Sequence, residues 1–330
     1  MGTHELRFGY GMRRNAAPPE GYTAAVEEAL DRLRSTGFEF GGFLSCHAPM
    51  AAEALSELGY ADHVPQWVRG NLRQRPYLER PAPRWPIAAA DWRTHLGDFG
   101  RVADWTALFE RELAGEPWPD VLARWWPRLL PGLVGALGHG LIRTVHAARS
   151  VASSPRPTKL QLDELAQGLG YWAARYTEPR GPGSLLFAEV PPTAGDDPEG
   201  ALRELALTAA GVYADRSPRP PIPLVHMVTV PAAVHLVLPA LPVELHEQSY
   251  HHARRAAEWI AGVFAGMFTA TLANPGSAPP DLGETIARAV ELGDEHAIKL
   301  AEACHRLGLA GPDDRLRRAP AALVGRLVRG

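Results

Sequence analysis

The chain has 330 residues, which allows one large domain or two of ordinary size. Hydrophobic residues make up 46% of it and charged residues 22%, values that are typical of a folded protein and exclude a disordered or fibrous one. The net charge of −3 leaves no basic excess that would attract nucleic acid or an anionic membrane, so we expect neither as a partner.

The composition also predicts the cellular compartment. Two cysteines, Cys46 and Cys304, are too few for a disulfide framework and fit a reducing environment. The N-terminal residues 1–15 lack the apolar stretch of a secretory signal. The longest apolar run, residues 260–273, is shorter than the roughly 20 residues that cross a bilayer, and we expect it to form a helix buried on all sides. The sequence therefore predicts a cytoplasmic protein.

Helical patterns dominate the chain, and proline-rich segments separate them. Helices are predicted over residues 21–37, 45–59, 160–176, 198–213, 281–292 and 293–308. Residues 184–190 are predicted as a short strand, and residues 224–241 as a buried helix kinked at Pro231, because that segment is too long for a strand. We predict an all-α fold, a single helical domain over residues 1–330 with a core from about residue 20 to 310.

Lysine is rare in this chain, with Lys159 and Lys299 standing among 34 basic residues. Arginine serves equally well where plain surface charge is needed, so a retained lysine is a candidate for chemistry that only a primary amine performs. Lys159 lies in a proline-rich loop, where we expect no such role.

The predicted helix 293–308 presents an unusual core-facing stripe. The stripe begins with His296 and Lys299, one turn apart, and continues with apolar residues. Glu295 and Glu302 are expected on other faces of the helix. A buried lysine needs a partner or a function, because an unpaired buried ammonium is costly. The alternative is that Lys299 extends to solvent or pairs with a buried carboxylate.

The predicted helix 45–59 repeats this pattern, with Ser45 as its N-cap and His47 opening its apolar face. A helix N-terminus disfavours imidazolium, so we expect His47 and His296 to stay neutral. Neutral imidazole is the form that ligates metals. The alternative for each is a hydrogen-bonded core histidine.

Two further histidines lie in apolar surroundings. His139 stands between glycines in residues 134–150, and His226 is followed one turn later by Thr229. His146 is expected nearer the surface because its neighbours are polar, and His235 competes with His226 as the functional residue of its segment. A third group, His251 and His252 beside Arg254 and Arg255, is expected to form a solvated stripe.

Several common motifs are missing from the sequence. The segment HEQSYH has one residue too many for the HExxH zinc motif, and GPGSLL lacks the third glycine of a dinucleotide fingerprint. The chain has no phosphate-binding P-loop and no GxSxG nucleophile elbow. The sequence therefore argues against a flavin or nicotinamide enzyme of Rossmann type.

Four segments taken in order resemble the questin oxidase-like family, which includes fungal enzymes that open anthraquinone and related polyketide rings. They are SCHAPMAAEALSELG, GHGLIRTVHA, LVHMVTVPAA and DEHAIKLAEAC, spread from about residue 40 to 305. The resemblance implies a non-haem iron site made by four histidines and a lysine carboxylated on its side-chain nitrogen. The matching residues are His47, His139, His226, His296 and Lys299, and Thr229 matches a threonine near the metal.

The function that this resemblance implies is ring cleavage of an aromatic polyketide by an iron-dependent oxygenase. Fe(II) is the expected metal, with Zn as the alternative, and CO2 (as the lysine carbamate) and O2 complete the expected cofactors. Imidazoles with one carboxylate-like oxygen suit Fe(II), and helical bundles build such sites with one ligand from each helix. Two alternatives stay open, an NADPH-dependent Baeyer–Villiger-type oxidase and a metal-free helical ligand-binding protein.

Overall fold

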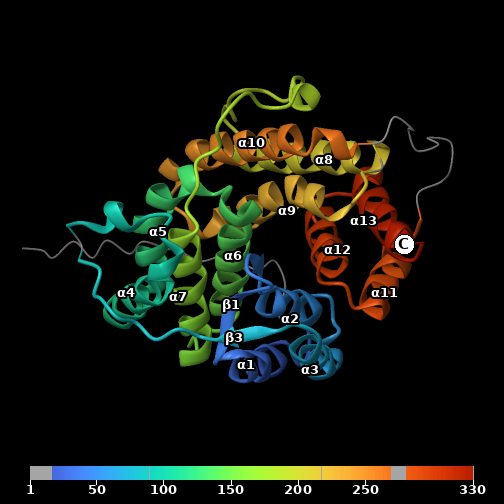
Figure 1. Ribbon diagram of the computed structural model, residues 1–330. Coiled ribbons are helices and arrows are strands. Elements are labelled where there is room, and N and C mark those ends of the chain that lie inside the picture. The colour runs from blue at the N-terminus through green and yellow to red at the C-terminus, as the bar shows by residue number, and fades with distance from the viewer. Residues whose placement is uncertain (1–16, 89, 217, 269–279, 330) are drawn as a thin grey trace, which may run out of the picture.

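The computed structural model describes residues 17–88, 90–216, 218–268 and 280–329. Thirteen α-helices make up most of this part of the chain, so the predicted all-α fold is confirmed (Figure 1). The helices are α1 (Tyr22–Leu33), α2 (Ala48–Glu57), α3 (Val64–Gln74), α4 (Val102–Gly115), α5 (Trp118–Leu129), α6 (His139–Ala152), α7 (Lys159–Ala174), α8 (Pro198–Arg216), α9 (Ile222–Val237), α10 (His246–Val263), α11 (Leu282–Leu292), α12 (Glu295–Gly308) and α13 (Asp314–Leu327).

Helix α9 lies at the centre of the molecule. Its neighbours are α6 on one side, α12 on the other, and α8 and α10 along its length (Figure 1). Every residue from Leu224 to His235 is buried, as expected of a helix that is apolar on all faces. The helix continues through Pro231, which confirms the predicted helix over this segment. Within the described chain, only residues 222–240 are long and apolar enough to cross a membrane, and 78% of this stretch is buried as a core helix.

A small antiparallel sheet was not predicted from the sequence. Strand β1 (Thr36–Phe40) lies between β2 (Leu44–Ser45) and β3 (Tyr77–Glu79). Gly41 and Gly42, both with positive φ, make the turn from β1 to β2, so the Gly-Gly pair was the hairpin signal. Because β2 runs directly into α2, the hairpin fixes the entry of the chain at His47.

The structure corrects three of the predicted elements. Residues 184–190 form a 3₁₀ turn (Leu185–Phe187) and no strand; the segment lies along α10, where it has no strand edge to pair with. The apolar run 260–273 does not form one buried helix, because α10 ends at Val263, an exposed residue, and residues 269–273 lie outside the described part. Ser45 belongs to β2, and the N-cap of α2 is His47.

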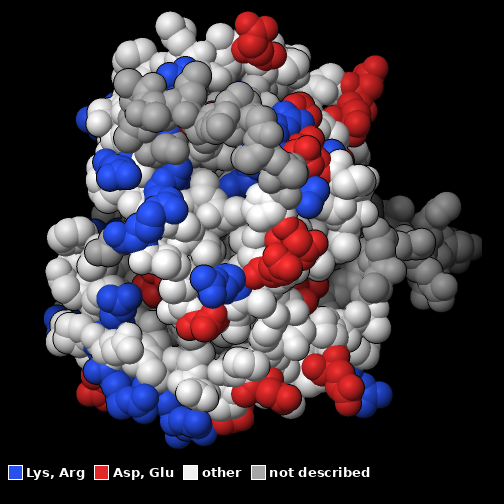
Figure 2. Space-filling model, turned by 90° about the vertical axis from the view of Figure 1, so that its right-hand side faces the viewer, with Lys and Arg blue, Asp and Glu red and all other residues white. Residues whose placement is uncertain are grey.

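The core and the surface agree with the composition. One hydrophobic cluster extends from Phe38 to Val324, and four of the tryptophans are fully buried in it: Trp105, Trp125, Trp126 and Trp172. Lys159 is exposed and pairs with Asp163 at the start of α7. The face drawn in Figure 2 carries basic and acidic residues side by side.

Candidate metal centre

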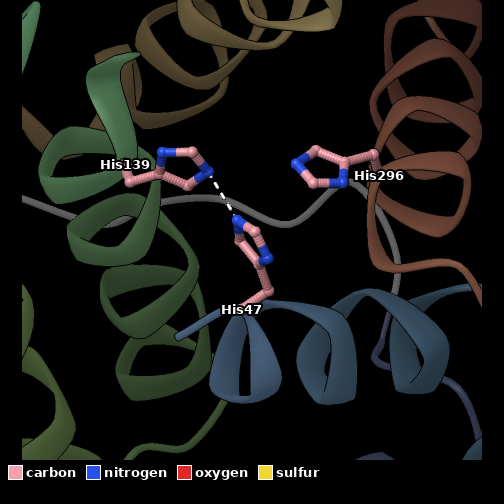
Figure 3. Close-up of side chains that lie close together, drawn as sticks. All are labelled: His47, His139 and His296. Atoms are coloured by element: carbon pink, nitrogen blue, oxygen red, sulfur yellow. Dashed lines mark hydrogen bonds between the residues drawn. The ribbon is translucent and has the colours of Figure 1, made fainter. Parts of the chain in front are cut away.

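The four predicted histidines lie near the N-terminal ends of four different helices. His47 is the N-cap of α2, and His139 is the first residue of α6. His226 lies early in α9, and His296 lies in the first turn of α12. Figure 3 shows three of them, with His47, His139 and His296 entering one small space from three sides. The chain fold therefore gathers imidazoles that are far apart in sequence.

The distances between the rings define a compact cluster. His47 Nε2 lies 2.6 Å from His139 Nε2, and His226 Nε2 lies 3.0 Å from the same atom. One nitrogen from each of His47, His139 and His296 lies within 4.8 Å of the other two. His226 joins this group of three through His139, and its ring centre lies 5.5 Å from that of His296.

The hydrogen bonds of the second ring nitrogens fix the tautomers of three of the histidines. His139 Nδ1 lies 2.5 Å from the carbonyl oxygen of Ala136, and His226 Nδ1 lies 3.1 Å from that of Pro223. A carbonyl oxygen only accepts, so each Nδ1 carries the proton and donates it. The Nε2 atoms of these two neutral rings are therefore bare, and their lone pairs face each other across 3.0 Å.

His47 follows the same rule. Its Nδ1 donates to the carboxylate of Glu295 across 3.2 Å, which leaves Nε2 bare and only 2.6 Å from His139 Nε2. Two bare nitrogens at this separation cannot hydrogen-bond to each other, because neither has a proton to donate. A cation between them would turn this repulsion into coordination, so the tautomers inferred from the hydrogen bonds fit a metal ion.

The electrostatics of the cluster keep the rings uncharged. Burial, and then the charge of Lys299, lowers the pKa of His47 well below its ordinary value. The pKa of His226 falls to about 3 for the same reasons. Burial and the neighbouring histidines lower the pKa of His139 and of His296 as well. The prediction that His47 and His296 are neutral is confirmed, although burial rather than the helix end is the leading cause.

Lys299 lies one turn after His296 and is buried, with 3% of its surface exposed. Its charge lowers the pKa of all four histidines, as expected of an amine that faces the cluster. Burial lowers its own pKa to about 8, against the opposing effect of Glu295 and Asp294. Among the described residues Lys299 makes no hydrogen bond or ion pair, so it neither extends to solvent nor forms the predicted alternative pair with a carboxylate.

Glu295 contacts the histidine cluster, although the sequence did not predict this position. It was expected off the core-facing stripe of α12, as was Glu302, yet 5% of Glu295 and 1% of Glu302 are exposed. Helix α12 contacts α2, α9, α11 and α13, so more than one of its faces is buried. The Glu295 carboxylate accepts hydrogen bonds from Nη2 of Arg75, at 3.0 Å to Oε1 and 3.3 Å to Oε2, in addition to the one from His47. This pairing explains how its carboxylate is tolerated in the interior.

His146 was predicted nearer the surface, and this prediction is wrong. Only 6% of the residue is exposed, and its Nδ1 lies 2.7 Å from Oε2 of the buried Glu53. The polar neighbours that suggested exposure include Arg149, which contacts the same carboxylate. The polar residues near His146 therefore belong to a buried ion network and not to a solvent-exposed surface.

The remaining candidates make no hydrogen bond to the four histidines. The hydroxyl of Thr229 donates to the carbonyl of Val225 at 3.4 Å rather than to any of the four histidines. His235 is buried but binds the carbonyl of Glu199 through Nδ1, so His226, not His235, is the histidine of α9 that joins the cluster.

The stripe predicted on α10 is only partly solvated. His251 and Arg255 are exposed, as predicted. His252 and Arg254 are half-buried, and Arg254 pairs with Glu258 at 2.9 Å. This stripe takes no part in the histidine cluster.

A strained turn immediately precedes His139. Ala136 and Leu137 have φ values of 47° and 55°, in the left-handed region that non-glycine residues rarely adopt. Strain of this kind costs about 1–3 kcal/mol per residue and persists where the surrounding structure imposes it. In this case the turn directs the Ala136 carbonyl at His139 Nδ1. The backbone therefore holds the ring in the tautomer that leaves Nε2 bare.

The donor set fits a divalent transition metal. Bonds of about 2.0–2.1 Å from imidazole nitrogens to one ion place neighbouring nitrogens about 3 Å apart at a right angle. The separation of 3.0 Å between His139 and His226 matches this spacing, and the 2.6 Å between His47 and His139 is somewhat shorter. Neutral imidazoles suit Fe, Zn, Cu and Ni, so the ring set by itself does not select one of them.

Comparison of the chain with protein-family models, curated proteins and solved structures gave no match. The assignment of the site therefore depends on its geometry and on the chemistry of its residues.

Proposed function

We propose that the chain is a metal-dependent oxygenase that opens a ring of an aromatic polyketide. Its metal, Fe(II), would be held by His47, His139, His226, His296 and the carboxylated side chain of Lys299. The observation that carries this proposal is the group of bare Nε2 atoms on uncharged rings that face one another in the buried interior. Bound iron would supply the one-electron chemistry that reaction with O2 requires.

Lys299 supports the proposal because its environment suits carbamate formation. Only the neutral amine reacts with CO2, and a pKa of about 8 leaves a fraction of it neutral near physiological pH. In this step Nζ forms a bond to the carbon of CO2 and one proton is released, which leaves –NH–COO⁻. The product converts a buried cation without a partner into an anionic oxygen ligand. Arginine cannot follow this route, because its guanidinium stays charged.

A cleft of about 560 Å³ offers space for a small molecule next to the centre. It lies between α3 and the α11–α12 corner, and Trp67 and Tyr60 are among its walls. The indole of Trp67 is held in place by its bond to the Gly293 carbonyl at 2.9 Å, which favours stacking on a flat ligand. Glu295 lines the cleft and also binds His47, so the cleft is one side chain away from the histidines.

Metal analysis of the purified full-length chain, prepared with Fe(II) in the absence of O2, tests the proposal. We expect about one equivalent of iron per chain in the wild type. His139→Ala should lose the metal, because two other ligand nitrogens face His139. His235→Ala is the matched control, since it removes a buried histidine from the core without touching the cluster, and it should retain the metal.

Variants of Lys299 extend the test to the carbamate. Lys299→Ala and Lys299→Arg should both lose iron, although arginine keeps the positive charge, because neither can form the oxygen ligand. Wild-type protein that contains no transition metal under these conditions would refute the proposal and favour a metal-free ligand-binding protein. Lys299→Arg with wild-type iron content would remove the carbamate from the site.

A further inference from the structure

A second buried polar cluster joins the helices that carry three of the histidines. It consists of Glu53 on α2, His146 and Arg149 on α6, and Glu302 on α12. All four side chains are buried; 2% of Glu53, 2% of Arg149 and 1% of Glu302 remain exposed. We refer to these four residues as the carboxylate–arginine network.

Arg149 is the centre of this network. Its guanidinium contacts both oxygens of Glu53, with Nε 3.2 Å from Oε1 and Nη2 in contact with Oε2. The same Nη2 lies 2.8 Å from Oε1 of Glu302, an ion pair whose angle falls outside that of a hydrogen bond. His146 and the hydroxyl of Tyr22 complete the shell of Glu53 at 2.7 and 2.8 Å. One arginine therefore bridges carboxylates from two other helices.

The two carboxylates of the network lie equally far along their helices from the histidines. Glu53 follows His47 by six residues, and Glu302 follows His296 by the same number. With a rise of 1.5 Å per residue, both carboxylates lie about 9 Å further along their helices. A buried ion group tolerates only arrangements in which each charge is paired, so it restricts how far apart the three helices can lie. A helix is stiff over this length, so the restriction extends to its histidine end.

From this geometry we propose that Arg149 is a positioning residue for the metal centre. By bridging Glu53 and Glu302 it sets the separation of α2, α6 and α12, and with it the spacing of the ligand nitrogens of His47, His139 and His296. The inference rests on the proposed metal site. Residues that orient metal ligands from outside typically change metal affinity by 10- to 100-fold.

The chain offers a matched control on the same helix. Arg143 of α6 is also buried, and it pairs with Glu164 of α7 at 2.7 and 2.9 Å. Arg149 pairs with helices that carry proposed ligands, whereas Arg143 pairs with α7, which carries none of them. Losing this pair removes a buried ion pair from α6 without loosening α6 from α2 or α12.

Zinc affinity of the full-length protein tests the role of Arg149. After removal of resident metal, the wild type, Arg149→Met, Glu302→Gln and Arg143→Met are titrated with Zn(II) in competition with a chromophoric chelator. Unfolding by urea is measured on the same samples, so that metal affinity is compared at known stability. We expect Arg149→Met and Glu302→Gln to bind Zn(II) at least about tenfold more weakly than the wild type. Arg143→Met should stay within about threefold.

Three results would overturn the inference. Wild-type affinity in Arg149→Met or in Glu302→Gln would show that the network does not set the ligand spacing. An equal loss of affinity in Arg143→Met would assign the effect to general destabilisation. Failure of the wild type to bind Zn(II) would reject the metal site itself and this inference with it. If Arg149→Met does not fold, Glu302→Gln decides, because glutamine keeps the shape of the side chain and removes its negative charge.

Discussion

Helices α2, α6 and α12 bury two polar clusters that differ in how their members are paired. At the N-terminal ends, the three uncharged imidazoles of these helices meet that of His226 from α9 beside Lys299. About 9 Å further along α2 and α12, Glu53 and Glu302 both pair with the guanidinium of Arg149 from α6. Burial raises the pKa of Glu53, but Arg149 and His146 outweigh it and hold the pKa below its ordinary value, so this carboxylate is charged.

The difference separates a structural cluster from a chemical one. In the carboxylate–arginine network each charged group meets an opposite charge, which is what a buried ion group needs for stability. In the histidine cluster the bare Nε2 atoms of His47 and His226 face that of His139, an arrangement that is repulsive without a cation. Functional sites are where local stability is commonly given up, and this contrast supports the proposal that the histidine end is the functional site.

The largest effect on stability is expected from Glu53→Met. The substitution leaves Arg149 with a single anionic partner and removes the acceptor of Tyr22 and His146. Breaking a buried pair by removing one member costs about 3–5 kcal/mol, so the midpoint of urea unfolding should fall accordingly. An exposed ion pair provides the control: Glu116→Gln, which loses a contact to Arg124, should leave the midpoint of urea unfolding nearly unchanged.

Equal urea midpoints for Glu53→Met and Glu116→Gln would contradict the contrast between the two clusters. The carboxylate–arginine network would then contribute no more to stability than a surface ion pair.

Lys299→Met is expected to stabilise the metal-free protein, by somewhat less than Glu53→Met destabilises it. The pKa of Lys299 is about 8 in the folded chain and near 10.5 when unfolded. Above pH 10.5 the amine is neutral in both states and contributes nothing. As the pH falls from 10.5 to 8 the unfolded state takes up the proton first, so stability is lost. At pH 7 the loss amounts to roughly 3 kcal/mol, which methionine should restore.

Urea unfolding of the two proteins at pH 7 and pH 10.5 measures this difference. The stabilisation by methionine should be present at pH 7 and shrink toward zero at pH 10.5. A metal-free wild type that is as stable as Lys299→Met at pH 7 would mean that the amine has a partner, and the contrast between the two clusters would lose its basis.

The sequence predicted the histidine end better than the arginine end. Histidines are rare in apolar helix faces, so His47, His139, His226 and His296 stood out from their neighbours. Glu302 looked like an ordinary surface residue, because one helix alone gives no sign of a second buried face. Burial of α12 on several sides follows from tertiary packing, which a helical period does not report.

Two other features depend on long-range contacts. The hairpin before His47 was missed because its strands are short, although Gly41 and Gly42 between aromatic residues signal such a turn. The role of Glu295 depends on His47 and Arg75, both more than 200 positions away in sequence. Such a pairing follows from the fold, and no local pattern indicates it.

The smallest effect is expected from His235→Asn, which tests whether the histidine cluster differs from a lone buried histidine on the same helix α9. Burial lowers the pKa of His235 below 6.5, so the unfolded chain gains a proton before the folded chain does and stability is lost as the pH falls below about 6.5. The slope due to one group is at most about 1.4 kcal/mol per pH unit. Asparagine keeps a donor for the Glu199 carbonyl but does not titrate, so the variant should lose less stability than the wild type between pH 6.5 and 5.5 while its iron content stays unchanged. Loss of iron in this variant would mean that His235 also supports the metal, and the contact with His139 would no longer distinguish His226 from His235.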